Sequence, residues 1–98
     1  MLVYICGKIT EIEKSVYTKK FNEAEAYLKA LGHEVANPLV FTKEIDENDY
    51  QKIMGKCVEV LLGCDEIYIL KDWVSSRGAK AEFHIANIYG ISVVFQEG

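Results

Sequence analysis

The sequence predicts a doubly wound α/β fold, in which about three helices cover both faces of a four-stranded parallel sheet. Two observations predict this fold class. Short continuous apolar runs alternate along the chain with longer segments whose apolar residues recur at helical spacing. A glycine follows each of the longer segments, as is common after a helix. Strands that are apolar throughout are typical of parallel sheets that helices cover on both sides.

The first half of the chain is expected to form a strand, a helix and a second strand. Residues 2–6 (LVYIC) are a continuous apolar run that a glycine ends, as in a buried strand. Residues 8–17 are polar and irregular, which predicts a loop. From about residue 18 to residue 31, apolar side chains follow helical spacing. Residues 35–36 then form a short strand that Asn-Pro stops, and residues 39–47 are expected to be a loop.

The second half repeats this alternation. Helical spacing returns from residue 48 or 49 to residue 62, and residues 67–70 (IYIL) form a third buried strand. Residues 71–77 are expected to be a loop. Residues 78–89 then predict a third helix, and residues 91–95 predict a fourth strand.

The predicted order of elements also locates the functional site. Strands that alternate with helices pair in parallel through right-handed crossovers. In such sheets, ligands bind beyond the carboxyl ends of the strands. Three predicted loops reach that edge, over residues 7–17, 37–48 and 71–78. Candidate functional residues are therefore sought in these loops.

The length and composition describe a single domain over residues 1–98. Half of the residues are apolar and 27% are charged, which excludes a disordered or low-complexity chain. Eleven basic and fifteen acidic residues give a net charge of -4, which disfavours a protein that binds duplex nucleic acid. A small anionic ligand stays open, because a few well-placed donors bind it.

The distribution of apolar residues and cysteines favours a cytoplasmic protein. No apolar run approaches the roughly 20 residues of a membrane span, and the segment MLVYICGKIT lacks the basic lead of a signal peptide. Cys6, Cys57 and Cys64 are odd in number and include no CxxC pair, which argues against disulfides and a zinc site. We expect reduced thiols, no bound metal and no membrane partner.

The first candidate cluster follows the first predicted strand, in the segment YICGKIT. Gly7 allows a ligand to approach the backbone closely, and Lys8 and Thr10 are able to donate hydrogen bonds to an anion. The segment lacks the further glycines of a Walker A loop or a GxGxxG loop. An ordinary turn between strand and loop explains the same residues equally well.

The second candidate cluster is the segment WVSSRGAKAE before the third predicted helix. Ser76 and Gly78 suit a helix N-terminus, where free backbone N–H groups favour an anion. Glu82 lies one turn further on and is able to act as a nucleophile toward an anomeric carbon. The simpler interpretation is that Ser76 caps the helix and Glu82 favours its dipole. Arg77 is equally consistent with a phosphate contact and with a solvated surface charge.

Four further residues are expected to have structural roles. Asp65 lies at the amino end of the third predicted strand, away from the expected site, and is interpreted as a turn residue. His33 follows the first predicted helix and is expected at the surface. His84 lies two residues after Glu82, on another face of the helix. Cys57 is interpreted as a small buried apolar residue.

Taken together, the order YICGKIT, ALGHEVANP, LLGCDEIYIL and WVSSRGAKAEFHIANIYG resembles the DUF4406 family of the nucleoside 2-deoxyribosyltransferase-like superfamily, over essentially the whole chain. It is more distantly similar to the 2′-deoxynucleoside 5′-phosphate N-hydrolases. The resemblance implies a flavodoxin- or Rossmann-like three-layer sandwich that cleaves the N-glycosidic bond of nucleosides or nucleotides. The products arise by hydrolysis or by deoxyribosyl transfer, and no cofactor is implied.

The resemblance also implies roles for particular residues. Glu82 would attack C1′ of the sugar and form a ribosyl-enzyme intermediate. Ser76 and the backbone of Gly78 would hold the sugar or the 5′-phosphate. Tyr4 and the loop over residues 7–10 would line the pocket for the base and the sugar.

The sequence departs from the resembled pattern on the second predicted helix. The family usually carries an Asp eight residues before the Asp of its Cys-Asp pair, and Cys57 occupies that position here. A thiol is a weak donor and largely neutral at pH 7. Asp49 and Asp72 are candidate replacements, and Asp72 is counted among the expected substrate-binding residues. Glu11 also stands where the family's first loop has a second glycine. The alternative function is therefore a nucleotide-binding or sensor module with little or no catalysis.

A homodimer or higher homo-oligomer is expected both from the sequence and from the resemblance. A sheet of this size leaves apolar helix faces poorly covered, and the apolar residues 93–95 leave little chain to cover an edge strand. The resembled enzymes are dimers or larger assemblies.

Overall fold

Helices and strands alternate along the chain in the computed structural model, which describes residues 1–97. The strands are β1 (Leu2–Cys6), β2 (Glu34–Ala36), β3 (Glu66–Ile69) and β4 (Ser92–Phe95). The α-helices are α1 (Lys14–Ala30), α2 (Pro38–Phe41), α3 (Tyr50–Leu61) and α4 (Arg77–Ile88), and a 3-10 turn, η1, spans Trp73–Ser75. The predicted β-α-β-α-β-α-β order is confirmed.

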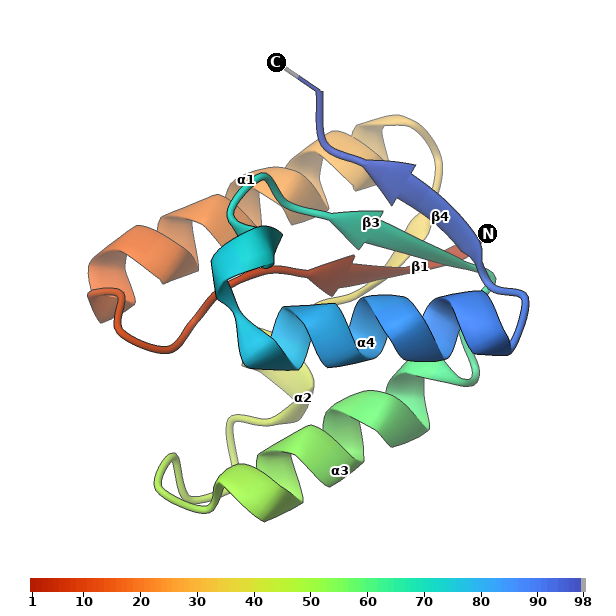
Figure 1. The fold of residues 1–98 in the computed structure, drawn as a ribbon. Coiled ribbons are helices and arrows are strands. Elements are labelled where there is room, and N and C mark those ends of the chain that lie inside the picture. Colours follow the sequence, from red (N-terminus) through yellow and green to blue (C-terminus); the bar gives the residue numbers. More distant parts are fainter. Residues whose placement is uncertain (98) are drawn as a thin grey trace.

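The four strands form one parallel sheet in the order β2-β1-β3-β4. Tyr4 on β1 lies opposite Ala36 on β2 and Ile67 on β3, so β1 occupies a central position. Helix α1 lies on one face of the sheet, and α3 and α4 lie on the other (Figure 1). This arrangement confirms the predicted three-layer α/β fold.

Alternate residues of β1 face the two layers of helices, as the period of a strand requires. Val3 and Ile5 pack against α1, whereas Tyr4 and Cys6 pack against α3 and α4. All four side chains are buried. The central strand β1 therefore contributes to an apolar core on each face of the sheet. The core between the sheet and helices α3 and α4 also contains the polar hydroxyl of Tyr4.

Two helical segments differ from the prediction. Helix α1 begins at Lys14, four residues earlier than expected, because its first turn is largely solvent-exposed, Val16 included, and shows no apolar period. The short helix α2 occupies part of the predicted loop. Asn37 caps it by accepting a hydrogen bond from the backbone N–H of Leu39 at 3.0 Å, and Pro38 occupies its first turn.

Asp65, His33 and His84, which were expected to have structural roles, lie away from the carboxyl edge of the sheet or at the surface of the protein. Asp65 accepts a hydrogen bond from the backbone N–H of Leu2 at 2.8 Å, which confirms its role in a turn. His84 is exposed on α4. His33 is only partly exposed, because Gly32 turns the chain with a φ of 93° and the His33 N–H donates back to Leu28.

Residues 1–97 contain no helix with both the length and the apolar content that a bilayer crossing requires. Within the same residues, no group of three or more His, Cys, Asp or Glu side chains is placed to hold a metal ion. Cys6, Cys57 and Cys64 are all free thiols, as expected.

Candidate active site

A cavity of about 150 Å³ opens at the carboxyl end of β1, between the first turns of α3 and α4. Six of the residues predicted from the sequence line it: Tyr4, Gly7, Thr10, Ser76, Gly78 and Glu82. They come from β1, from the loop that follows β1 and from the start of α4. The topology brings them together because parallel strands end at the same edge of the sheet.

Glu82 is a buried carboxylate, with 6% of the residue exposed to solvent. It lies on α4, and its Oε2 accepts a hydrogen bond from the Tyr4 hydroxyl at 2.8 Å. Burial raises the pKa of the Glu82 carboxyl from its ordinary value near 4.5 to about 7, because the charged form loses its hydration. Polar contacts from Tyr4 and from two neighbouring thiols oppose this rise. The simpler interpretation, in which Glu82 only favours the helix dipole, does not account for its burial.

Tyr4 holds this carboxylate in place. Its side chain is fully buried on the central strand, and its ring lies 6.1 Å from the ring of Phe41 on α2. Burial and the nearby Glu82 carboxylate raise the pKa of the Tyr4 hydroxyl well above its usual value. Tyr4 is therefore a neutral hydrogen-bond donor, and it fixes the direction in which Glu82 presents its second oxygen.

Two thiols complete the buried surroundings of Glu82. The Cys6 thiol lies 3.5 Å from the carbonyl oxygen of Ala79, and burial raises its pKa. Burial also raises the pKa of Cys57 to about 11. Both thiols are neutral at pH 7, so neither is an activated nucleophile. Cys57 is buried as predicted, yet it also lines the cavity.

The first turn of α4 forms another wall of the cavity. The Ser76 side chain caps the helix by accepting a hydrogen bond from the backbone N–H of Ala79 at 3.1 Å. Among residues 1–97, the backbone N–H groups of Arg77 and Gly78 have no acceptor. Free N–H groups at a helix N-terminus favour an anion. A Cβ atom at Gly78 would lie 3.3 Å from the Tyr50 hydroxyl, so glycine permits the close approach of α3 and α4.

Gly7→Ala is expected to lower the free energy of unfolding by about 1–3 kcal/mol. An added Cβ would lie 2.7 Å from Leu70 Cδ1, and Leu70 is itself buried. Thermal unfolding measures the loss. Gly55→Ala is the matched control, because a Cβ there meets no atom within 4 Å and alanine favours a helix interior. Equal melting temperatures for Gly7→Ala and the parent chain would contradict this prediction.

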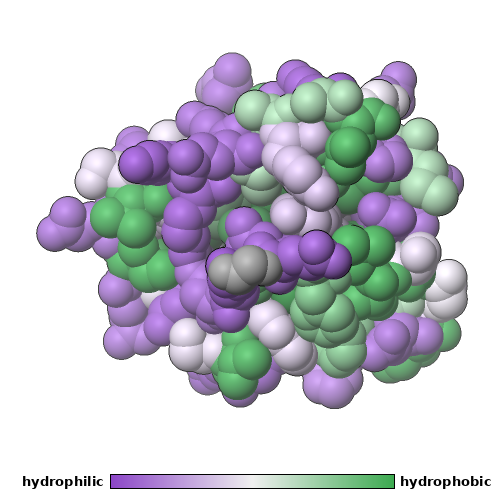
Figure 2. Space-filling view, turned by 90° about the horizontal axis from the view of Figure 1, so that it is seen from above, coloured by the Kyte–Doolittle hydropathy of each residue, from purple (hydrophilic) through white to green (hydrophobic). Residues whose placement is uncertain are grey.

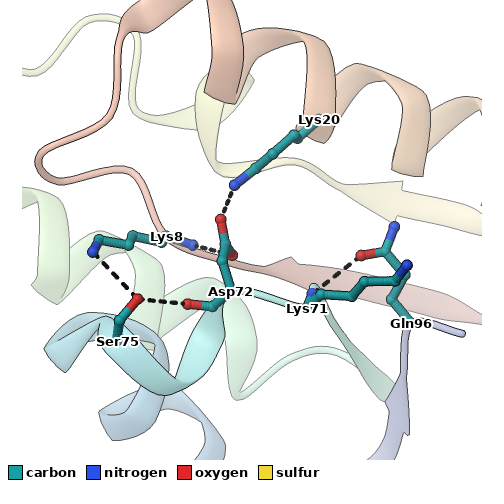
Figure 3. A network of polar contacts seen from close by, with 6 residues as sticks. All are labelled: Lys8, Lys20, Lys71, Asp72, Ser75 and Gln96. Carbon is teal, nitrogen blue, oxygen red and sulfur yellow. Dashed lines mark hydrogen bonds and ion pairs between the residues drawn. The ribbon is translucent and has the colours of Figure 1, made fainter. Parts of the chain in front are cut away.

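Lys8 and Asp72 were expected to contact substrate, but neither lines the cavity. Asp72 accepts a hydrogen bond from the backbone N–H of Lys8 at 3.1 Å and pairs with Lys20 of α1. The Lys8 ammonium group donates to Ser75 Oγ at 3.2 Å (Figure 3). Asp72 directly precedes the 3-10 turn η1, and its carboxylate faces Lys20 of α1. The contacts of Lys8 with Asp72 and Ser75 join the loop after β1 to the loop after β3.

Asp49, the other candidate replacement for the family's Asp, is also engaged elsewhere. It caps α3 by accepting a hydrogen bond from the backbone N–H of Lys52 at 3.1 Å. Its carboxylate is not part of the cavity wall. Asp49 and Asp72 therefore both lie outside the wall of this cavity.

Comparison with known families agrees with the extent of the resemblance. The model of a family described as "Domain of unknown function (DUF4406)" matches residues 1–95. The chain belongs to the DUF4406 family. No curated protein matches the chain.

The cavity of this DUF4406 protein also includes residues that the sequence did not single out. They lie in the loop before α3 and on α3 itself: Glu47, Tyr50, Ile53 and Met54. The loop was expected to reach the carboxyl edge of the sheet, and it does. Its path was not predictable, because neither apolar spacing nor a motif indicates which side chain of an exposed loop turns inward.

A larger hollow of about 670 Å³ lies on the α1 side of the DUF4406 domain. Its wall includes Tyr27 of α1, Tyr68 of β3 and Gln96 after β4. Size alone would favour this hollow as a ligand site. It contains no buried carboxylate among the described residues, and Glu82 packs on the opposite face of the sheet. The smaller cavity is therefore the better candidate for an active site.

Proposed function

We propose that this protein cleaves the N-glycosidic bond of a nucleoside or nucleotide, with Glu82 as the nucleophile. One observation carries the proposal: a buried carboxylate lies in the wall of a cavity and is oriented by the hydroxyl of Tyr4 at 2.8 Å. The resemblance to the nucleoside 2-deoxyribosyltransferase-like superfamily supports the same role for Glu82. Hydrolysis and deoxyribosyl transfer share this first step.

The proposed reaction has two steps. In the first, a carboxylate oxygen of Glu82 bonds to C1′ of the sugar, and the electron pair of the C1′–N bond leaves with the base, which takes up a proton. In the second, the oxygen of water or a nitrogen of another base bonds to C1′ and loses its proton. The ester bond breaks, and its electron pair returns to Glu82.

The surroundings of Glu82 suit this chemistry. Burial disfavours the charged carboxylate, so converting it into an uncharged ester relieves the cost of desolvation. Tyr4 donates to one carboxylate oxygen of Glu82, and the proposal assigns the attack on C1′ to the other. The free N–H groups at the start of α4 would bind a sugar hydroxyl or a 5′-phosphate, together with the Ser76 hydroxyl.

Detection of free base by chromatography tests the proposal. The protein is incubated with a panel of nucleosides, 2′-deoxynucleosides and their 5′-monophosphates, and Glu82→Gln is incubated in parallel. Base released by the parent chain and lost in the variant supports the proposal. Release that is equal in both proteins removes Glu82 from the reaction, and no release from any compound rejects the glycosidase function.

A second candidate function is nucleotide binding without turnover. Cys57 favours it, because a neutral thiol lies where the resembled family carries an Asp. Glu82 is therefore the only buried carboxylate in the cavity wall within residues 1–97. Loss of a group that assists the departing base lowers the rate by about 10²–10⁴-fold.

Cys57→Asp separates the two candidates. We expect the variant to lose about 2 kcal/mol or more of stability, because it buries a second carboxylate beside Glu82. Thermal unfolding measures this loss, and the same panel measures base release. Release by the parent chain supports the glycosidase. Release by Cys57→Asp alone, with nucleotide-induced stabilisation of the parent chain, supports the binding module.

The proposal includes a cytoplasmic homodimer or higher homo-oligomer. The edge strand β4 leaves Val94 and Phe95 exposed at 39% and 47%. Viewed from above, hydrophobic residues form several separate patches between hydrophilic ones (Figure 2). These patches support an association between chains, because exposed apolar surface and an unpaired edge strand both favour it.

A further inference from the structure

We propose that Glu47 selects the base of the substrate by accepting two N–H donors from a guanine-type base at the rim of the cavity. This inference rests on the proposed function, because it assumes a nucleoside or nucleotide whose C1′ lies beside Glu82. It assigns Glu47 a role in specificity and leaves the chemical step to Glu82.

The cavity is too small to enclose both the sugar and the base of a nucleoside. Its volume of about 150 Å³ is below the range of roughly 300–1,000 Å³ that encloses a whole drug-sized ligand. Glu82 is buried, so C1′ reaches it only when the sugar occupies the enclosed part. The base must then lie at the opening of the cavity, against the lining residues that remain exposed to solvent.

Three polar lining residues are exposed: Thr10, Glu47 and Tyr50. Tyr50 presents an aromatic ring that is 53% exposed, and its hydroxyl lies close to Gly78. An exposed aromatic ring suits a base, because every base has a face that stacks. Glu47 lies three residues before Tyr50, in the loop that leads into α3.

Glu47 is the carboxylate of this loop that is free to meet a ligand in the cavity. Asp46 accepts a hydrogen bond from the backbone N–H of Asn48 at 2.9 Å, and Asp49 accepts one from Lys52 at 3.1 Å. Within residues 1–97, the Glu47 side chain has no hydrogen bond or ion pair, and it lines the cavity. Its acceptor capacity is therefore unused by the fold.

The chemistry of a carboxylate indicates which base it would select. An ionised carboxylate only accepts hydrogen bonds, and its two oxygens suit a pair of parallel N–H donors. Guanine offers such a pair on one edge, the ring N1–H and the exocyclic amino group. Hypoxanthine has the ring N–H without the amino group. The two bases therefore form a matched pair of probes for Glu47.

The experiment compares 2′-deoxyguanosine with 2′-deoxyinosine, each with and without a 5′-monophosphate. Base release is measured for the parent chain, for Glu47→Gln and for the control Glu44→Gln, which changes an exposed carboxylate of the same loop outside the cavity wall. We expect kcat/KM of the parent chain to favour the guanine substrate by about tenfold or more. The preference falls to near unity in Glu47→Gln, mainly through KM, and stays unchanged in Glu44→Gln.

The outcomes separate this inference from the proposed function. Base release without a guanine preference, or with a preference that Glu47→Gln retains, overturns the role of Glu47 and leaves the glycosidase function intact. If no compound releases base, the glycosidase function fails, and calorimetric titration with the same four compounds then tests Glu47 by binding. Tighter binding of the guanine compounds that is lost in Glu47→Gln supports the selective role. Equal binding, or no binding, rejects it.

Discussion

Glu82→Gln is expected to lower base release by about three orders of magnitude or more, because an amide oxygen does not form the bond to C1′ that the carboxylate forms. Glutamine has almost the same volume as glutamate, and its carbonyl oxygen is able to accept the hydrogen bond from Tyr4. The variant therefore removes the nucleophile and keeps the packing of a residue that is 6% exposed.

Single-turnover measurement of base release, with the substrate that the panel identifies, tests this prediction. Glu59→Gln is the matched control, because it makes the same chemical change on an exposed face of α3. The control is expected to retain the parent rate. A Glu82→Gln rate within tenfold of the parent rate would mean that another group attacks C1′.

The same variant is expected to be more stable than the parent chain at pH 8, by about 3 kcal/mol. The pKa of the Glu82 carboxyl is raised from its ordinary value near 4.5 to about 7 by burial, so the folded protein holds this proton more tightly than the unfolded chain. The stabilising effect of the bound proton is fully present below pH 4.5, and it is lost as the pH rises through about 7. The difference between the ordinary pKa near 4.5 and the pKa of about 7 in the folded protein corresponds to about 3 kcal/mol.

Urea unfolding of both proteins at several values between pH 4.5 and pH 8 tests this second prediction. The difference between the proteins isolates Glu82, because other groups titrate alike in both; Glu25, whose pKa is lowered chiefly by its hydrogen bond from Lys29, is one of them. The two stability curves are expected to diverge as the pH rises. Curves that stay parallel would show that burial does not raise the pKa of the Glu82 carboxyl. Because the nucleophile acts in its ionised form, base release should increase over the same interval.

The strands and the longer helices were predictable because the spacing of their apolar residues indicates which side chains are buried. All four strands are apolar runs or short apolar pairs, and helices α3 and α4 repeat apolar residues at helical spacing. The short helix α2 was not predicted, because its formation depends on capping by Asn37 rather than on periodicity. The first turn of α1 was missed for a similar reason, since it buries no apolar side chain and so leaves no period to detect.

The candidate site was predictable where the backbone decides the position of a side chain. Tyr4 and Glu82 face one another because a strand period and a helix period orient them toward the same core. Lys8 and Asp72 lie outside the cavity wall, where the Asp72 carboxylate pairs with Lys20 of α1 and accepts from the backbone of Lys8. The position of Glu47 at the rim of the cavity depends on the path of a loop, which local sequence does not determine.

The hydrogen bond between Tyr4 and Glu82 joins residues that are 78 positions apart in the chain. Tyr4 belongs to a strand with neighbours on both sides, so it leaves its place only when the whole sheet opens. A ligand that requires both residues thus binds only the fully folded chain, and its binding free energy adds to that of global unfolding. At a concentration 100 times its Kd, such a ligand adds about 3 kcal/mol. A melting-temperature screen would therefore find substrates and unreactive analogues alike, and bound ligand would slow amide hydrogen exchange in β1.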